Sequence, residues 1–408
     1  MPARTLPALR ARFEEIRRVT RDLARPFSAE DCQVQSTADA SPVKWHLAHT
    51  TWFFETFVLG RTGGAFGYLF NSYYESVGPR LARPNRGLMT RPSLQEVLDY
   101  RARIEEEVLA RFDALEDTRR GLIEVGLHHE QQHQELILTD VKHLLSLNPL
   151  APAAFAAPAD GGAFRPTPAE RSRTEFSGGG GVADIGHAEG EGFAFDNEGP
   201  RHRVYLEPFR LSPRLSTCAD YLAFIEDGGY RRPELWLSDG WDAVRTGGWE
   251  APLYWRRGEH GWTLFTLSGL RPLDPEEPVC HVSYYEADAF ARWSGARLPT
   301  EQEWETVAAE TPVEGHFAES GRFHPRPSTG SLFGDVWVWT RSAYGPYPGY
   351  RPPEGALGEY NGKFMCGQMV LRGGSCATPA SHIRPTYRNF FPPSARWQFS
   401  GVRLAEDA

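Results

Sequence analysis

The stretch Gly126–Leu138, "GLHHEQQHQELIL", decides which fold the first part of this chain is expected to adopt. Its apolar residues and two of its histidines recur at steps of three and four positions, the spacing of one face of an α-helix. With its flanks, this face contains Leu122, Val125, His129, Gln132, His133, Leu136 and Asp140. Two histidines one turn apart on an inward face are placed to share a metal ion. The stretch therefore predicts a metal-binding helix.

The same stretch matches the H-E-x-x-H pattern of zinc peptidases, with Glu130 in the position of the general base. The peptidase pattern requires a third ligand downstream. His143 follows His133 by ten residues, but the glycine-containing continuation of the metzincins is absent. Glu130 lies about 100° around the helix from His129, and we expect it on the helix surface. A peptidase is therefore the weaker interpretation.

Three further amphipathic helices are predicted before this one. The apolar face of the first consists of Leu9, Phe13, Ile16, Thr20 and Leu23. Ser41 followed by Pro42 predicts the N-cap and first turn of a second helix through "VKWHLAHTTWFFETFVL". Ser93 and Glu96 form a capping box that begins a third, and the fourth spans roughly residues 118–147. Four such helices predict a four-helix bundle.

The second helix offers a third histidine. Its inward face carries Trp45, His49, Trp52, Phe53 and Thr56. Facing helices of a bundle commonly supply the ligands of one metal site, so His49 is a candidate to join His129 and His133. A single histidine on an apolar face is more often a hydrogen-bonded core residue, and for His49 both interpretations stay open. His46, His128 and His143 lie on other faces and are expected to be solvated or structural.

The remainder of the chain has a different texture. We assign residues 1–150 to the bundle and 151–175, rich in proline and alanine, to a linker. Residues 176–408 consist of short aromatic and β-branched runs separated by turn residues, which predicts an α+β domain with much loop. The chief helical segments in it are "CADYLAFIEDGG" and "YYEADAFARWSG".

Composition excludes several classes of protein. The 408 residues include 44 basic and 53 acidic ones, a net charge of -9 without a dense basic block, so no nucleic-acid partner is expected. No apolar run is long enough to span a bilayer, and the N-terminal stretch lacks the apolar core of a signal peptide. Five dispersed cysteines without a CxxC pair indicate reduced thiols. The sequence predicts a cytoplasmic protein without membrane contact.

Several long motifs resemble one enzyme family, the EgtB-type non-haem iron sulfoxide synthases of ergothioneine biosynthesis. "SPVKWHLAHTTWFFETFVLG" and "GLHHEQQHQELILTDVKH" are similar to its DinB-like bundle. "PVCHVSYYEADAFARWSGARLPTEQEWE", "LRGGSCAT" and "RNFFPP" resemble the formylglycine-generating-enzyme fold, a C-type-lectin-like α+β domain. The resemblance covers nearly the whole chain. It implies a multidomain α and α+β protein.

The resemblance also implies a reaction and a site. In this family, Fe(II) and O2 are used to join a thiol sulfur to C2 of hercynine, Nα-trimethylhistidine, as a sulfoxide. Carried over by motif, the Fe(II) ligands are His49, His129 and His133. Gln132 corresponds to a contact with the substrate imidazole, and Asn389 to a contact near its amino-acid head, followed by Phe390 and Phe391.

The second substrate is less closely specified. Tyr73 and Tyr74 in "NSYYE", with Phe391, resemble the subgroup whose catalytic tyrosines come from the bundle and whose donor is free cysteine, with γ-glutamylcysteine as the alternative. Two adjacent tyrosines are as well explained by a packed loop. A substrate carboxylate favours a forked cation, and among the arginines of "GPRLARPNRG" we select Arg80 and Arg83. Arginines in such a loop are more often solvated.

The chain departs from the pattern at one position, and other functions compete. The usual "GxVWEW" motif reads "GDVWVW" here, so Val338 replaces a carboxylate.

Related synthases make ovothiol-type or selenoneine-type products. DinB-like bundles also serve metal-dependent thiol transfer, and the C-terminal fold serves as a binding scaffold. Oxygen consumption and substrate competition distinguish these functions.

Overall fold

The computed structural model describes residues 5–62, 64–157, 176–327 and 330–408. These residues divide into two compact units. The first contains the described parts of Met1–Pro149, together with two short returning segments, Gly190–Asp196 and Arg351–Lys363. The second contains the rest. Most of the expected linker, residues 158–175, lies outside the described residues.

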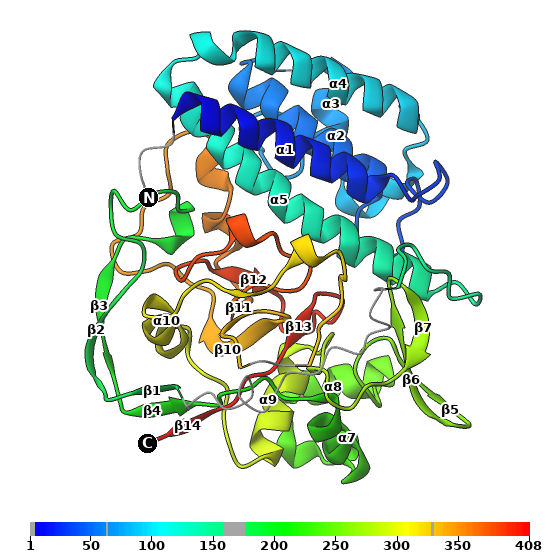
Figure 1. Cartoon of the computed structure of the whole chain (residues 1–408), viewed down its shortest axis with the longest axis vertical. Helices are drawn as coiled ribbons and strands as arrows, with labels where there is room; N and C mark the ends of the chain where they lie inside the picture. Colours follow the sequence, from blue (N-terminus) through cyan, green and yellow to red (C-terminus); the bar gives the residue numbers. More distant parts are fainter. Residues whose placement is uncertain (1–4, 63, 158–175, 328–329) are drawn as a thin grey trace. The chain divides into compact units, whose positions relative to one another are not determined.

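Helices dominate the first unit (Figure 1). They are α1 (Leu6–Ala24), α2 (Val43–Phe53), α3 (Gly64–Phe70), α4 (Leu94–Arg111) and α5 (Asp117–Ser146). The four long helices are those that periodicity predicted. Helix α2 packs against α5, α1 packs mainly against α5, and α4 packs against α2. The short helix α3 was not predicted. The four-helix bundle is thus confirmed.

Local signals at the helix ends were correct in one case and wrong in another. Ser93 caps α4 through a capping box with Glu96, as predicted. Ser41 does not cap α2, because Pro42 occupies the N-cap position and no side chain bonds to the first turn. The Ser41 hydroxyl instead accepts a hydrogen bond from Arg86 at 2.8 Å. The Ser41 oxygen that was expected to cap α2 therefore accepts a hydrogen bond from a residue outside the helix.

The core of the bundle follows the predicted stripe of α1, whereas on α5 it contains Ile123 and Leu127 rather than the predicted Leu122 and Val125, which are half-buried. Leu9, Phe13 and Ile16 of α1 pack with Ile104 and Val108 of α4 and with Ile123 and Leu127 of α5. Burying a side chain of this size contributes about 1.5–3 kcal/mol. This shared core holds the helices that carry the candidate ligands.

A glycine lets α2 and α5 approach closely. A Cβ atom at Gly126 of α5 would stand 2.7 Å from the ring of Phe54 and 3.0 Å from that of Phe53. Real side chains essentially never pack so tightly, so any larger residue would push the helices apart. Gly126 lies less than one turn before His129, and its small size brings that histidine near α2.

The second unit is built from short strands. β1 (Phe176–Gly178), β4 (Phe209–Leu211) and β14 (Ala405–Asp407) form an antiparallel sheet. Three further groups are the hairpin β2 (Gly181–Ile185) with β3 (His202–Leu206), the meander β5 (Trp255–Gly258), β6 (Gly261–Thr266) and β7 (Gly269–Pro272), and the parallel pair β8 (Gly315–His316) with β9 (Phe333–Gly334). The fifth has the order β12 (Asn389–Phe391), β11 (Met369–Arg372), β10 (Trp337–Ala343), β13 (Ser400–Gly401).

The helices of this unit are α7 (Cys218–Glu226), α8 (Ser238–Gly247), α9 (Tyr284–Trp293) and α10 (Glu301–Ala309). The two expected helical segments correspond to α7 and α9. Helix α10 was not predicted, although Thr300 and Glu303 form a capping box at its start. Val338 lies in β10, is 1% exposed and pairs with Arg372 and Gly401 of the neighbouring strands. An apolar side chain suits this buried position.

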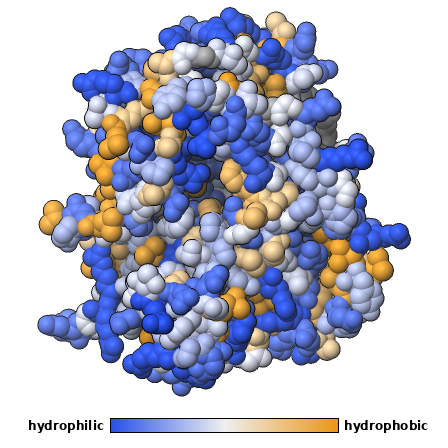
Figure 2. Space-filling model, turned by 180° about the vertical axis from the view of Figure 1, so that it is seen from behind, coloured by the Kyte–Doolittle hydropathy of each residue, from blue (hydrophilic) through white to orange (hydrophobic). Residues whose placement is uncertain are grey.

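The cysteines and the hydropathy of the helices agree with the sequence predictions. The five cysteines form no disulfide, as their spacing predicted, and Cys366 is the exposed one. Among the described residues, no helix combines the length and apolar character that a bilayer crossing requires. The face seen from behind is mainly hydrophilic, with hydrophobic residues in small separate groups (Figure 2).

Candidate metal centre

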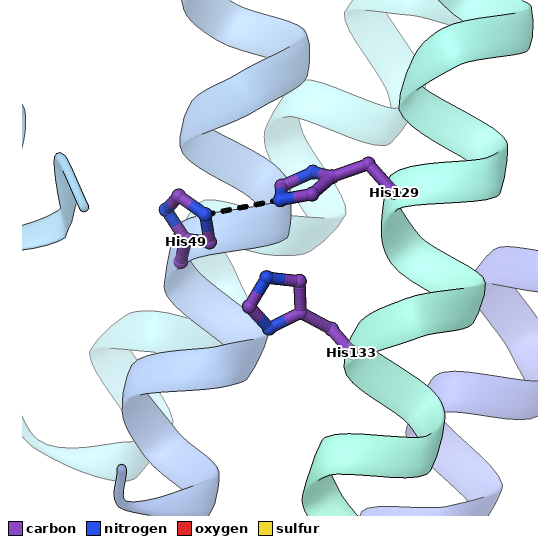
Figure 3. A group of neighbouring side chains, drawn as sticks. All are labelled: His49, His129 and His133. Carbon is purple, nitrogen blue, oxygen red and sulfur yellow. Dashed lines mark hydrogen bonds between the residues drawn. The ribbon is translucent and has the colours of Figure 1, made fainter. Parts of the chain in front are cut away.

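Three histidines converge inside the bundle (Figure 3). His49 comes from α2, and His129 and His133 come from successive turns of α5. One ring nitrogen from each lies within 4.8 Å of the other two. The Nε2 atoms of His49 and His129 are 3.1 Å apart. The structure therefore brings together the trio that the sequence predicted.

The ring of His49 is held on three sides. Trp45 stacks on it at a centroid distance of 4.5 Å, and Trp52 stacks at 5.7 Å. The spacing of these residues along α2, four and then three positions, aligns the rings on one face. The Nδ1 of His49 lies 2.6 Å from the carbonyl oxygen of Phe70, which only accepts hydrogen bonds. Nδ1 therefore carries the proton, and Nε2 of the neutral ring presents a lone pair.

The surroundings keep all three imidazoles neutral. Burial, with the proximity of the other rings, lowers the pKa of His49 and of His133 well below the usual value. Burial also lowers the pKa of His129 to about 3, against the opposing charge of Glu130. The Nδ1 of His129 has no hydrogen-bond partner among the described residues. Neutral imidazole is the form that binds a metal ion.

His46 has a role that helix geometry did not predict. Of the two expected environments, solvated or structural, the structure excludes the first, because His46 is 2% exposed and lies against His133. Its Nδ1 is 2.7 Å from Nδ1 of His133, and its Nε2 is 3.0 Å from Oδ2 of Asp140. His133 therefore has a partner on the side facing away from the convergence point.

Glu130 is not at the surface, so the expectation for it was wrong. It is fully buried, accepts hydrogen bonds from Arg17 at 2.9 Å and Thr20 at 2.6 Å, and pairs with Arg101. Although burial opposes ionisation, Arg101 and Arg17 lower the pKa of Glu130 to about 2. A carboxylate held between two arginines is not free to act as a general base. This environment removes the main support for a peptidase.

Tyr73 and Tyr74 lie beside the histidines rather than among them. Tyr74 is fully buried and its ring is 5.7 Å from Trp52, the residue that stacks on His49. The ring of Tyr73 packs on that of Tyr74, with the ring centroids 4.6 Å apart. Burial raises the pKa of both, so both stay protonated at neutral pH.

Sequence reasoning missed Tyr360, which reaches this site from the segment Arg351–Lys363. Its hydroxyl donates to Oε1 of Gln132, a residue 228 positions earlier. Its ring packs edge-on against His129 at 5.7 Å and stacks on Phe195 at 5.3 Å. No local pattern marks this residue, because its neighbours in space come from other parts of the chain.

The segment is fastened to the tyrosine loop by an acidic residue. The carboxylate of Glu359 accepts hydrogen bonds from the backbone amides of Glu75 and Ser76, each at 2.9 Å. Lys363 donates to the carbonyl oxygen of Tyr73. These contacts position Tyr360 and Tyr73 next to each other, with their rings 6.1 Å apart.

The three arginines of the loop differ sharply in environment. Arg80 is bound to Glu75 at 2.7 Å, and Arg83 is exposed. Arg86 is 2% exposed, lies 3.4 Å over the ring of Trp45 and donates to Ser41 and Ser72. Among the described residues Arg86 forms no ion pair. Burial, followed by the charges of Arg83 and Arg80, lowers its pKa to about 8.

The remaining predicted residues lie in the second unit. Asn389, Phe390 and Phe391 form β12, where all three are partly buried. Phe390 stacks on Tyr344 at 4.0 Å, and Phe391 packs edge-on near Trp397 at 6.4 Å.

Comparison with known proteins gives consistent matches over most of the chain. Residues 12–137 match the DinB superfamily, and residues 162–330 and 329–408 match the sulfatase-modifying factor enzyme 1-like domain. Hercynine oxygenase from Mycolicibacterium thermoresistibile is 33% identical, with 90% of this chain and 87% of that protein aligned. Hercynine oxygenase from Mycobacterium tuberculosis is 33% identical over 90% of this chain and 91% of its own length. The formylglycine-generating enzyme of Streptomyces coelicolor is 29% identical and aligns with 62% of this chain and 97% of its own length.

Proposed function

The chain belongs to the hercynine oxygenase family of oxidoreductases, and we propose that it uses Fe(II) and O2 to couple a thiol to hercynine in ergothioneine biosynthesis. The C–H bond at imidazole C2 and the thiol S–H bond are replaced by a C–S bond and a sulfoxide S=O bond. One oxygen atom of O2 enters the sulfoxide, and the other leaves as water with both hydrogens. The substrates together lose four electrons, which O2 accepts.

The observation that supports this proposal most directly is the buried trio His49, His129 and His133. Three neutral imidazoles suit Fe(II), and they leave its positive charge uncancelled, which favours a thiolate as a further ligand. Three ligands also leave coordination positions open. When bound, Fe(II) supplies the redox chemistry with O2. The donor set therefore fits the metal that the family implies.

Gln132 is the residue we assign to the hercynine ring. Its Oε1 already accepts the hydrogen bond from Tyr360, so its amide NH2 group is directed elsewhere. An NH2 group donates to an unprotonated imidazole nitrogen. Tyr360 thus orients the amide that recognises the substrate ring.

Tyr73 and Tyr74 are the proposed proton donors. Both phenols stay protonated at neutral pH because burial raises their pKa. A protonated phenol near the bound substrates supplies the proton that oxygen reduction requires. Delivery of this proton favours C–S coupling over oxidation of the thiol to a sulfinate.

Arg86 is the cation we assign to the carboxylate of the sulfur donor, with Arg83 as a second candidate. A buried guanidinium without an ion pair is costly, and a substrate carboxylate would satisfy it. Free cysteine, the donor implied by the tyrosine pair, carries one such carboxylate. γ-Glutamylcysteine, which carries two, is the alternative donor.

Asn389, Phe390 and Phe391 remain the proposed contacts of the trimethylated amino-acid head. A trimethylammonium group donates no hydrogen bond, so its recognition depends on aromatic faces. Such a contact is worth about 0.5–2 kcal/mol. The stacked pair Phe390 and Tyr344 offers faces of this kind.

Turnover with defined substrates tests the proposal. Protein loaded with Fe(II) under anaerobic conditions is mixed with hercynine, cysteine and ¹⁸O2, and the products are analysed by mass spectrometry. We expect an adduct of the two substrates that contains one labelled oxygen, and no adduct from His133→Ala. Formation of only cystine or cysteine sulfinate would refute the assignment.

Substrate competition separates the related functions. Histidine in place of hercynine tests the ovothiol-type reaction, and a selenium donor tests the selenoneine-type reaction. Coupling without O2, or with Zn²⁺ as the only metal, would indicate a thiol transferase instead.

A further inference from the structure

A continuous chain of polar contacts leads from the start of α2 to one of the three converging histidines. The backbone amide of Ser41 donates to Oδ2 of Asp140 at 2.8 Å. The same oxygen is 3.0 Å from Nε2 of His46, and Nδ1 of His46 is 2.7 Å from Nδ1 of His133. Asp140, His46 and His133 are all buried. The chain links α2 and α5 at the level of the metal centre.

Hydrogen-bond chemistry determines where the protons lie in this chain. A carboxylate only accepts hydrogen bonds, so Nε2 of His46 carries a proton and donates to Asp140. When Nε2 holds the only ring proton of His46, its Nδ1 is an acceptor. The facing Nδ1 of His133 must carry a proton and donate to it. This leaves the lone pair of His133 on Nε2, the nitrogen directed at His49 and His129.

We propose that His46 and Asp140 are positioning residues that set the tautomer of His133 and thereby the affinity of the centre for its metal. The inference rests on the three-histidine metal site of the proposed function. An ordinary metal-bound histidine is supported directly by a carboxylate or carbonyl group, as His49 is by Phe70. For His133 a second imidazole stands between the carboxylate and the ligand.

A second buried histidine of the bundle, His128, is held by other partners. His128 is equally buried, at 2% exposed, but it stacks on Phe193 at 4.0 Å and contacts Arg12 at 3.0 Å. His128 is therefore a matched control for the loss of a buried imidazole from this bundle.

Metal affinity tests the proposal without reference to turnover. We would prepare metal-free wild type, His46→Phe and His128→Phe, and titrate each with Co(II) by calorimetry and visible absorption. Phe keeps the ring volume of His46 but removes the acceptor for His133. We expect His46→Phe to bind Co(II) about 10–100-fold more weakly with an altered absorption spectrum, and His128→Phe to stay within about threefold of wild type.

A second variant interrupts the series of hydrogen bonds at Asp140. It tests the inference independently if His46→Phe does not fold. Asp140→Leu leaves His46 in place without its acceptor, so its Nδ1 can carry the proton and oppose that of His133. We expect a loss of affinity similar to that of His46→Phe, and no further loss in the double variant, because both changes break one chain. Far-ultraviolet circular dichroism of the metal-free proteins identifies the folded variants.

The outcomes separate this inference from the proposed function. Wild-type affinity in folded His46→Phe or Asp140→Leu overturns the inference, as do additive losses in the double variant. Loss of Co(II) binding in His133→Ala, with no sulfoxide formed by wild type, would leave the inference standing and reject the proposed reaction.

Discussion

Arg86 is a buried cation whose environment favours binding of a substrate carboxylate. It is buried on the face of Trp45, and no carboxylate among the described residues pairs with it. A hydrogen bond to a charged group is worth about 1.5–3 kcal/mol, or roughly 10–150-fold in binding. We expect Arg86→Gln to raise the KM for cysteine by about this factor and to leave the KM for hercynine nearly unchanged.

Steady-state kinetics with each substrate varied in turn measures this effect. Arg103→Gln is the control, because Arg103 is exposed on α4 and lies over the ring of Tyr100. An equal rise in both KM values would show that Arg86 supports the fold of the site rather than the donor.

Tyr73 and Tyr74 are tested by the products that form in their absence. In Tyr73→Phe/Tyr74→Phe, the rings and their packing remain, but both hydroxyls are lost. Since a positioned proton donor contributes typically 10²–10⁴-fold, we expect sulfoxide formation to fall by about 100-fold or more while O2 consumption continues. Quantifying sulfinate and sulfoxide by mass spectrometry checks this. A proportional loss of both products would contradict the assigned role.

Tyr360 is expected to act on binding of hercynine through Gln132. Tyr360→Phe removes one hydrogen bond to Oε1 and keeps the contacts of the ring with His129 and Phe195. A neutral hydrogen bond contributes about 0.5–1.5 kcal/mol, so we expect the Kd for hercynine to rise about 2–10-fold. Calorimetry with the Co(II)-loaded protein measures it. An unchanged Kd would mean that Gln132 keeps its orientation without Tyr360.

At the scale of elements, the packing of α5 against α2 depends on Gly126. In Gly126→Ala the new Cβ meets the rings of Phe54 and Phe53, at 2.7 and 3.0 Å. Overpacking of this kind typically costs about 1–3 kcal/mol. We expect a lower free energy of unfolding and weaker Co(II) binding, because the separation moves His129 away from His49.

A second glycine on the same helix provides the control. Gly121 is exposed, and a Cβ atom there meets nothing within 4 Å. Gly121→Ala should therefore stabilise α5 by about 0.5–1 kcal/mol without affecting Co(II) binding. Urea denaturation of the two metal-free variants measures whether each change raises or lowers the free energy of unfolding. Stabilisation by Gly126→Ala would show that the helices are not held at this distance by the glycine.

Elements also show why some predictions succeeded. The stripe of α1 and the capping box at Ser93 are local patterns, and the structure reproduces them. On α5 the prediction was only partly correct, because Leu122, Val125 and Leu136 are half-buried while Ile123, Leu127 and Ile137 are buried. Ser41 fits an N-cap pattern equally well, but Arg86 occupies its hydroxyl. Glu130 was placed by helical geometry alone, which takes no account of Arg17 on α1 or Arg101 on α4. Predictions from local sequence fail where a charged residue from another part of the chain binds the polar side chain, as at Ser41 and Glu130.

At the scale of the whole molecule, buried titratable groups predict loss of stability in acid. Burial lowers the pKa of His129 from 6.5 to about 3. Between these values the unfolded chain binds more protons than the folded one, so the free energy of unfolding rises with pH. Although burial opposes it, neighbouring cations lower the pKa of Glu130 and of Glu277 from 4.5 to about 2, which acts in the same direction at lower pH.

We therefore expect the free energy of unfolding of the metal-free protein to fall continuously as the pH is lowered from about 6.5 to about 3. Urea denaturation at each pH measures it. In Glu277→Gln the part of the curve below pH 4.5 should be shallower, because Gln has no proton to gain. A flat curve between pH 6.5 and 4.5 would contradict neutral buried histidines.

The order of residues along the chain was sufficient to predict the four helices, the change of fold class after the bundle and the pairing of His129 with His133. These depend on helical periodicity and capping, which act over a few neighbouring residues. The motifs extended this to His49, 80 positions from His129. Folding in three dimensions was needed to place His46 behind His133, Glu130 between two arginines, Arg86 on Trp45 and Tyr360 on Gln132. Each of these contacts joins residues far apart in the chain or on different helix faces, and spacing along the sequence carries no information about which distant side chains burial will bring together.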